Sequence, residues 1–143
     1  MIVIASDHGG FILKEEIKKF LIEKKHDVRD LGTSSPDSVD YPDFAHKLAG
    51  ALERGEAGTG ILVCGSGIGM AMAANRHRGI RAAVCTNEYM AAMARKHNDA
   101  NVLCLGERVV GVDLARSIVT AFLETGFEGG RHQRRVEKIE KPE

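Results

Sequence analysis

The chain has 143 residues, of which 43% are hydrophobic and 28% are charged, a composition that suffices for a buried core and argues against disorder. Its 20 Lys and Arg residues balance 20 Asp and Glu residues, so the net charge is zero. This balance gives no overall reason to expect a nucleic acid or a membrane surface as partner.

The location of the protein is also constrained by its sequence. The N-terminal apolar run meets Asp7 too early for a signal peptide, and no apolar segment is long enough to span a bilayer. The three cysteines, Cys64, Cys85 and Cys104, are odd in number, and each lies in an apolar run typical of a strand. We therefore expect reduced thiols in a cytoplasmic protein.

Apolar runs alternate with segments of helical periodicity along the chain. In chain order they predict strand 2–5, helix 11–25, strand 27–31, helix 44–52, strand 60–64, helix 67–74, strand 80–85, helix 88–96, strand 102–105 and helix 112–123. A loop is predicted over 33–42, and a basic tail over about 131–143, helical from Gln133.

Strands that alternate with helices are joined by right-handed crossovers, which produce a parallel sheet covered on both faces. The prediction is one α/β domain over residues 1–143, a Rossmann-like three-layer sandwich with a five-stranded parallel sheet and helices on both faces.

Cys64 ends the clearest buried strand and is followed by Gly65-Ser66-Gly67-Ile68-Gly69. Glycines let the backbone approach a ligand, and a helix that begins there presents N–H groups and the positive end of its dipole. The same field favours a thiolate, and a thiolate beside N–H donors suits proton abstraction next to a carbonyl. Free cysteine also completes buried strands with no chemical role, and these residues alone leave the two interpretations evenly balanced.

The spacing around Cys64 disfavours two other kinds of site. The pattern G-x-G-x-G differs from the dinucleotide pattern G-x-G-x-x-G, and no acidic residue ends the next strand, so a nicotinamide cofactor is disfavoured. Ser66 does not fit a hydrolase nucleophile, because Cys64 stands where the first glycine of G-x-S-x-G belongs.

Polar residues at other element ends are weaker candidates. Asp7 and His8 follow the first strand, where a turn and a helix cap explain them equally well. His97 and Asn98 precede the fifth strand, at the edge of the sheet away from Cys64, so fold logic alone does not bring them into one site.

A metal site is not predicted, because His26, His46 and His77 lack ligand spacing and the sequence contains no C-x-x-C. Arg131 and Arg135 are four residues apart and would share one face of a helix, where paired guanidinium groups suit a phosphate dianion. A solvated charged tail is the alternative for these two residues.

Taken in order, these segments resemble the ribose-5-phosphate isomerase B family, also called the ribose/galactose isomerase family. The resemblance runs through nearly the whole chain. The matching segments are SDHGGF at 6–11, LK at 13–14, GT at 32–33, DYP at 40–42, GILVCGSGIG at 60–69, AAN at 73–75, GIRA at 79–82, HNDAN at 97–101, RVVG at 108–111, GGRH at 129–132 and RV at 135–136.

The resemblance implies a role for each matching residue. Cys64 matches the general base that moves a proton between C1 and C2 of the sugar. His97 matches the residue that helps to open the sugar ring. The turn that stabilises the enediolate oxygens through its N–H groups is matched by Gly65, Ser66, Gly67, Ile68 and Gly69.

The resemblance also implies how the substrate is held. Asp7 matches a contact to sugar hydroxyls, and Asn98 matches a residue close to the reacting end. Arg131 and Arg135 match phosphate ligands, and the remaining contributors to the phosphate site are expected to be His8 and Arg108. Ser66 stands where many members carry threonine, and it keeps the hydroxyl group.

These matches predict an enzyme that interconverts D-ribose 5-phosphate and D-ribulose 5-phosphate through an enediolate, in the non-oxidative branch of the pentose phosphate pathway. No metal or organic cofactor is expected. The family is dimeric or larger and completes its site with residues of a neighbouring subunit, so we expect a homodimer or tetramer with shared sites. The alternatives are an isomerase of a 6-phosphohexose, such as allose 6-phosphate or a galactose 6-phosphate subunit, and a non-catalytic nucleotide-binding module.

Overall fold

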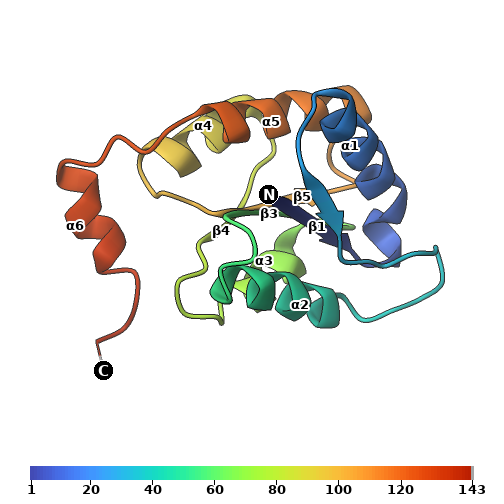
Figure 1. Ribbon diagram of the computed structural model, residues 1–143, viewed down its shortest axis with the longest axis horizontal. Coiled ribbons are helices and arrows are strands. Elements are labelled where there is room, and N and C mark those ends of the chain that lie inside the picture. Colours follow the sequence, from blue (N-terminus) through green and yellow to red (C-terminus); the bar gives the residue numbers. More distant parts are fainter. Residues whose placement is uncertain (143) are drawn as a thin grey trace.

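The computed structural model describes residues 1–142 and consists of a central sheet with helices on both faces (Figure 1). The elements are, in chain order, β1 (Ile2–Ser6), the 3-10 helix η1 (His8–Gly10), α1 (Phe11–Glu23), β2 (Val28–Asp30), α2 (Tyr41–Glu53), β3 (Thr59–Cys64), α3 (Ile68–Ala74), β4 (Ala82–Val84), α4 (Glu88–Lys96), β5 (Val102–Gly106), α5 (Val112–Glu124) and α6 (Arg131–Glu137).

The sheet has the strand order β2-β1-β3-β5-β4, and every neighbouring pair is parallel. The predicted α/β sandwich with a five-stranded parallel sheet is therefore confirmed. The chain leaves β1 towards β2 on one side and later returns to β3 on the other side of β1. Such a switch point leaves a crevice at the carboxyl ends of the two strands, where ligands bind in open α/β sheets.

Two apolar clusters hold the layers together, one on each face of the sheet. Because side chains alternate along a strand, Ile2 and Ile4 of β1 belong to the cluster under α1, α4 and α5, whereas Val3 and Ala5 belong to the cluster over α2 and α3. Figure 1 shows the two groups of helices on opposite sides of the sheet. Full burial of each large aliphatic side chain contributes about 1.5–3 kcal/mol to these contacts.

The edge strands are shorter than predicted. β2 covers Val28–Asp30 instead of 27–31, and β4 covers Ala82–Val84 instead of 80–85. Each of these strands pairs on one side only. At the start of β4, the amide of Arg81 donates to the Asn101 side chain at 2.8 Å rather than to a strand partner, so the ladder begins one residue later.

Two helices begin earlier than predicted. α2 begins at Tyr41 instead of Phe44, since Pro42 fits the first turn of a helix, and the predicted loop therefore ends at Asp40. α6 begins at Arg131 instead of Gln133. The last residue of the predicted basic tail, 143, lies outside the described residues.

α6 stands apart from the sheet and from the other helices (Figure 1). Its residues are half-buried or exposed except for His132, which is buried. None of the helices within residues 1–142 has the length and apolar character needed to cross a membrane.

Candidate active site

A cavity of about 560 Å³ opens at the carboxyl ends of β1, β3 and β5. It therefore coincides with the switch point of the sheet. Its walls are formed by Asp7, Tyr41, Cys64, Gly65, Ser66, Ile68, Gly69, Met72, Arg108 and Val109. The structure thus brings together Asp7, the glycine-rich turn and Arg108 around Cys64.

Cys64 is the last residue of β3, and its side chain is buried against the turn that follows. The amide of Gly67 donates a hydrogen bond to Cys64 Sγ at 3.1 Å. Gly67 has a φ of 82°, a left-handed conformation that favours glycine and turns this amide back towards the sulfur. An N–H donor aimed at the sulfur stabilises negative charge there, so the local structure suits a thiolate.

α3 begins directly after this turn. The amide of Ile68 donates to Ser66 Oγ at 3.2 Å, which fixes the hydroxyl beside the cavity. The first turn of an α-helix leaves amide N–H groups without partners in the helix, and they lie at the positive end of its dipole. An oxyanion that forms near Cys64 would therefore meet N–H donors and a favourable field.

The two other thiols have different surroundings. Burial raises the pKa of Cys85 to about 11. Burial likewise raises the pKa of Cys104, and the nearby Cys64 and Cys85 raise it further. Both thiols are therefore protonated at neutral pH, and neither lines the cavity.

Asp7 and His8 extend from the end of β1 into η1. Asp7 is buried and accepts a hydrogen bond from the amide of Gly10 at 3.1 Å, so it caps η1 while it also faces the cavity. His8 is exposed, and its Nδ1 accepts from the amide of Val39 at 3.1 Å. In a neutral ring this contact places the proton on Nε2, which is then free to donate.

Three cavity residues were not predicted from sequence, namely Tyr41, Met72 and Val109. The ring of Tyr41 lies so close to Gly69 that a Cβ there would be 2.5 Å from Tyr41 Cε1. Gly69 therefore lets a residue of α2 reach the glycine-rich turn. Tyr41 belongs to the segment DYP, and the proline in that segment was the sequence signal that a helix begins there.

The loop after β5 places Arg108 over the turn. The amide of Glu107 donates to the Cys64 carbonyl at 2.9 Å, and the amide of Arg108 donates to the Gly65 carbonyl at 3.1 Å. These contacts continue the pairing of β3 and β5 beyond the strands. A cation is thereby held at the mouth of the cavity.

Six predicted residues do not line this cavity: the neighbouring His8 and Gly67, and the more distant His97, Asn98, Arg131 and Arg135. His97 caps the C-terminal end of α4, and Asn98 follows it on the surface. Arg131 and Arg135 are exposed on α6, one turn apart, as their spacing predicted. Within one chain the candidate site is therefore divided into two parts.

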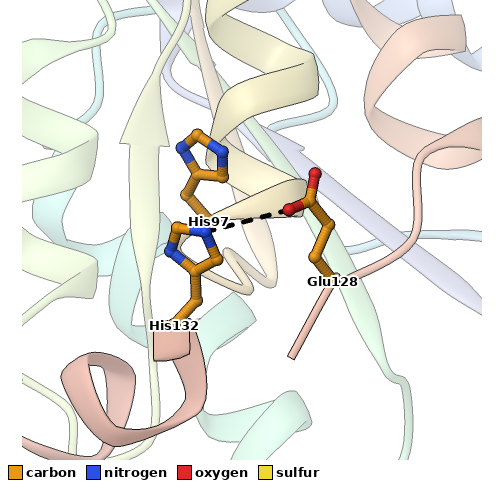
Figure 2. A group of neighbouring side chains, drawn as sticks. All are labelled: His97, Glu128 and His132. Atoms are coloured by element: carbon orange, nitrogen blue, oxygen red, sulfur yellow. Dashed lines mark ion pairs between the residues drawn. The ribbon is translucent and has the colours of Figure 1, made fainter. Parts of the chain in front are cut away.

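His97 is half-buried and stacks on His132 of α6, with ring centroids 4.3 Å apart and ring planes inclined by 10° (Figure 2). Glu128 lies beside this pair, with its Oε2 3.8 Å from His132 Nε2. Burial lowers the pKa of His132, and the neighbouring His97 and Arg131 lower it further. His132 was not predicted as a site residue.

His97, Glu128 and His132 have potential ligand atoms within 4.8 Å of one another. In nearly parallel rings the lone pairs of the ring nitrogens run side by side, whereas a tetrahedral site needs them to converge on one point. This arrangement favours stacking over coordination of a metal ion.

Comparisons with known proteins identify the family to which the chain is similar. The sequence profile of the Ribose/Galactose Isomerase family matches residues 2–139. Ribose-5-phosphate isomerase B of Escherichia coli strain K12 is 51% identical over 138 residues, which cover 96% of this chain and 93% of that protein.

Solved structures give the same result. Ribose-5-phosphate isomerase B of Clostridium thermocellum matches with a TM-score of 0.96 and 58% identity, over 96% of this chain and 93% of that one. Ribose 5-phosphate isomerase of Thermotoga maritima matches with a TM-score of 0.97 and 53% identity, over 99% of this chain and 97% of that one.

Proposed function

The chain belongs to the ribose/galactose isomerase family and is an isomerase that interconverts ribose 5-phosphate and ribulose 5-phosphate, and we propose that Cys64 is its base. The observation that carries this proposal is the hydrogen bond from the Gly67 amide to Cys64 Sγ at the wall of the cavity. It supports a thiolate next to a helix N-terminus, which is the pairing of base and oxyanion site that an enediolate requires.

The chemical step begins from the open-chain aldose. The Cys64 thiolate removes the proton from C2, and the electron pair of the C–H bond moves into the C1–C2 bond while the C1 carbonyl oxygen gains negative charge. The thiol then returns the proton to C1, and the proton of the C2 hydroxyl passes to the C1 oxygen, which leaves a ketone at C2 and a hydroxyl at C1. The carbonyl itself acidifies the neighbouring C–H bond, so the step needs neither a metal ion nor an organic cofactor.

Preorganised donors surround the place where the charge develops. N–H groups of the turn Gly65–Gly69 face the enediolate oxygens, and Ser66 supplies a fixed hydroxyl. Asp7, which lines the same cavity, holds sugar hydroxyls. Because such groups are already oriented, they stabilise the transition state more than they stabilise the ground state.

His97, Asn98, Arg131 and Arg135 complete the site from a second copy of the chain. His97 assists ring opening, Asn98 lies near the reacting end, and the two arginines bind the phosphate with His8 and Arg108.

We propose a homodimer or tetramer of the cytoplasm in which α6 and the end of α4 reach the cavity of the partner subunit. Two features support this assembly: α6 stands away from its own body, and apolar side chains at the cavity are more than half exposed, namely Ile68 (51%), Val109 (56%) and Met72 (66%).

Replacement of Cys64 by alanine tests the role of the base. Turnover of ribose 5-phosphate should fall by about a thousandfold, as expected for loss of a general base, while the Kd for the substrate stays within about threefold. Cys85→Ala is the matched control, because it removes a thiol that does not line the cavity, and it should keep wild-type turnover. Near-normal turnover in Cys64→Ala would exclude Cys64 as the base.

Allose 6-phosphate is assayed beside ribose 5-phosphate with the same wild-type preparation. A higher kcat/KM for the pentose supports the assignment of substrate. A higher kcat/KM for the hexose would keep the chemistry and change the physiological substrate.

A further inference from the structure

His132 occupies an unusual position for a polar residue on an outlying helix. It is 7% exposed, whereas its α6 neighbours Arg131 and Gln133 are exposed. Its imidazole ring is covered on one face by the parallel ring of His97 (Figure 2). The stacking therefore connects α6 to the end of α4 and restricts the side-chain rotation of His97.

Backbone contacts also hold together the end of α4, the loop before α6 and the start of α6. The amide of Glu128 donates to the Lys96 carbonyl at 3.1 Å, which ties the loop before α6 to the last residue of α4. The amide of His132 donates to the Gly129 carbonyl at 3.0 Å, which closes the turn at the start of α6. The carboxylate of Glu128 lies beside the edge of that ring, 3.8 Å from His132 Nε2.

The groups around His132 favour the neutral form of its ring. His132 faces His97 of α4, Glu128 of the preceding loop, and Arg131 and Arg135 of its own helix. Burial and the neighbouring positive groups lower the pKa of His132, with only Glu128 opposing them. Since two stacked imidazolium rings would repel each other, the stacking also favours a neutral His132 ring.

We propose that His132 is a positioning residue that holds the His97 ring in the orientation required to open the sugar ring. The inference rests on the proposed function, in which His97 is the ring-opening group. It assigns no contact with the substrate to His132. Its effect passes through the stacked ring, and Glu128 supports it from the side.

The test compares two substrates that differ in whether a ring must open. Ribose 5-phosphate is mainly a furanose in solution, whereas ribulose 5-phosphate is open-chain because its C5 hydroxyl is esterified. We expect His132→Ala to lower kcat for ribose 5-phosphate by about tenfold to a hundredfold, the cost of a misplaced group. Exchange of the C1 hydrogen of ribulose 5-phosphate with solvent deuterium, at saturating substrate, should stay within about threefold of wild type, because it needs Cys64 but no ring opening.

Two further variants separate the stacking from a general loss of structure. His132→Phe keeps a flat ring against His97 and should recover at least about a third of the wild-type kcat for ribose 5-phosphate. Glu128→Gln, whose side chain is half exposed and does not threaten folding, should lower this kcat by about threefold and leave the exchange rate unchanged. His26→Ala removes an exposed histidine on another surface and should match wild type in both assays.

Equal losses of turnover and exchange in His132→Ala would overturn the inference, because they indicate structural damage. Full turnover in His132→Ala, or no recovery in His132→Phe, would overturn it too. If the wild-type protein itself does not convert ribose 5-phosphate, the proposed function fails first, and this outcome is distinct from all the others.

Discussion

The three cysteines differ in what surrounds the sulfur. Cys64 Sγ accepts a hydrogen bond from an amide and faces a cavity, whereas burial raises the pKa of Cys85 to about 11 and also raises the pKa of Cys104. Iodoacetamide at neutral pH should therefore alkylate Cys64 at least about tenfold faster than either of the others. Peptide mass spectrometry over time measures this ratio.

Two observations accompany this labelling experiment. Loss of isomerase activity should follow alkylation of Cys64 in time, and saturating ribose 5-phosphate should slow both. Equal labelling of all three cysteines, or full activity after complete modification of Cys64, would contradict the assignment of Cys64 as the base.

Some site residues were predictable because their signal is local in the sequence. Cys64 and the glycines after it stand next to one another, so their chemistry could be inferred from the strand and the turn alone. Tyr41 and Val109 reach the cavity from α2 and from the loop after β5, and only the fold brings them there. His132 was missed because it lies among basic residues typical of a solvated tail, while its contact with His97 joins α4 and α6.

Lys14 of α1 connects three elements through one buried ammonium group. Its side chain is fully buried, and Nζ donates to Asp30 Oδ2 of β2 at 2.7 Å and to the Thr33 carbonyl at 2.8 Å. Burial alone would raise the pKa of Asp30, but hydrogen bonds from Lys14 and Lys18 outweigh it and lower that pKa. This ion pair fixes the short edge strand β2 and the start of the loop that carries Val39 to His8.

Lys14→Met should destabilise the protein by about 3 kcal/mol at neutral pH, because it leaves Asp30 and the Thr33 carbonyl without their buried donor. Lys18→Met is the matched control, since Lys18 contacts the same carboxylate from a more exposed position and should cost about 1 kcal/mol or less. Urea unfolding followed by circular dichroism measures both. A cost for Lys14→Met no larger than that of Lys18→Met would contradict the structural role of Lys14.

The pH dependence of this ion pair has a definite sign. The folded pKa of Asp30 lies below its unfolded value of about 4, so the stabilisation is fully present above that value and is lost as the pH falls through the folded pKa. The stability difference between wild type and Lys14→Met should therefore be smaller at about pH 3.5 than at about pH 7. An unchanged difference would show that the charge on Asp30 is not what Lys14 stabilises.

The helices, strands and layers were predicted more reliably than their ends. Unbroken apolar runs such as 60–64 and 102–105 identify buried central strands, and β3 and β5 occupy the middle of the sheet. β2 and β4 were predicted too long because an edge strand is limited by its single neighbour, which the sequence does not show. The strand order, with β5 inside β4, also depends on packing between elements and not on local pattern.

At the scale of the whole molecule, the residues of the candidate site form two separate parts of one chain. Strand topology placed His97 away from Cys64, and the structure agrees, because His97 stacks on α6 and does not line the cavity. A site that needs both parts must combine two copies of the chain. In a closed two-fold dimer, each of the two sites would then take Cys64 from one subunit and His97 from the other.

This arrangement predicts that two inactive variants restore activity when they are mixed. With ribose 5-phosphate as substrate, Cys64→Ala and His97→Ala should each be inactive alone, because every site in either homodimer lacks one group. In a mixed dimer one site lacks both groups, and the other combines Cys64 from the His97→Ala subunit with His97 from the Cys64→Ala subunit. When equal amounts are unfolded together and refolded, half of the dimers are mixed and each has one intact site of two, so about one quarter of wild-type activity should return.

The same variants refolded separately and mixed just before the assay should stay inactive if subunits exchange slowly. No recovery after joint refolding, with dimers present by light scattering, would mean that Cys64 and His97 act within one chain or in different reactions.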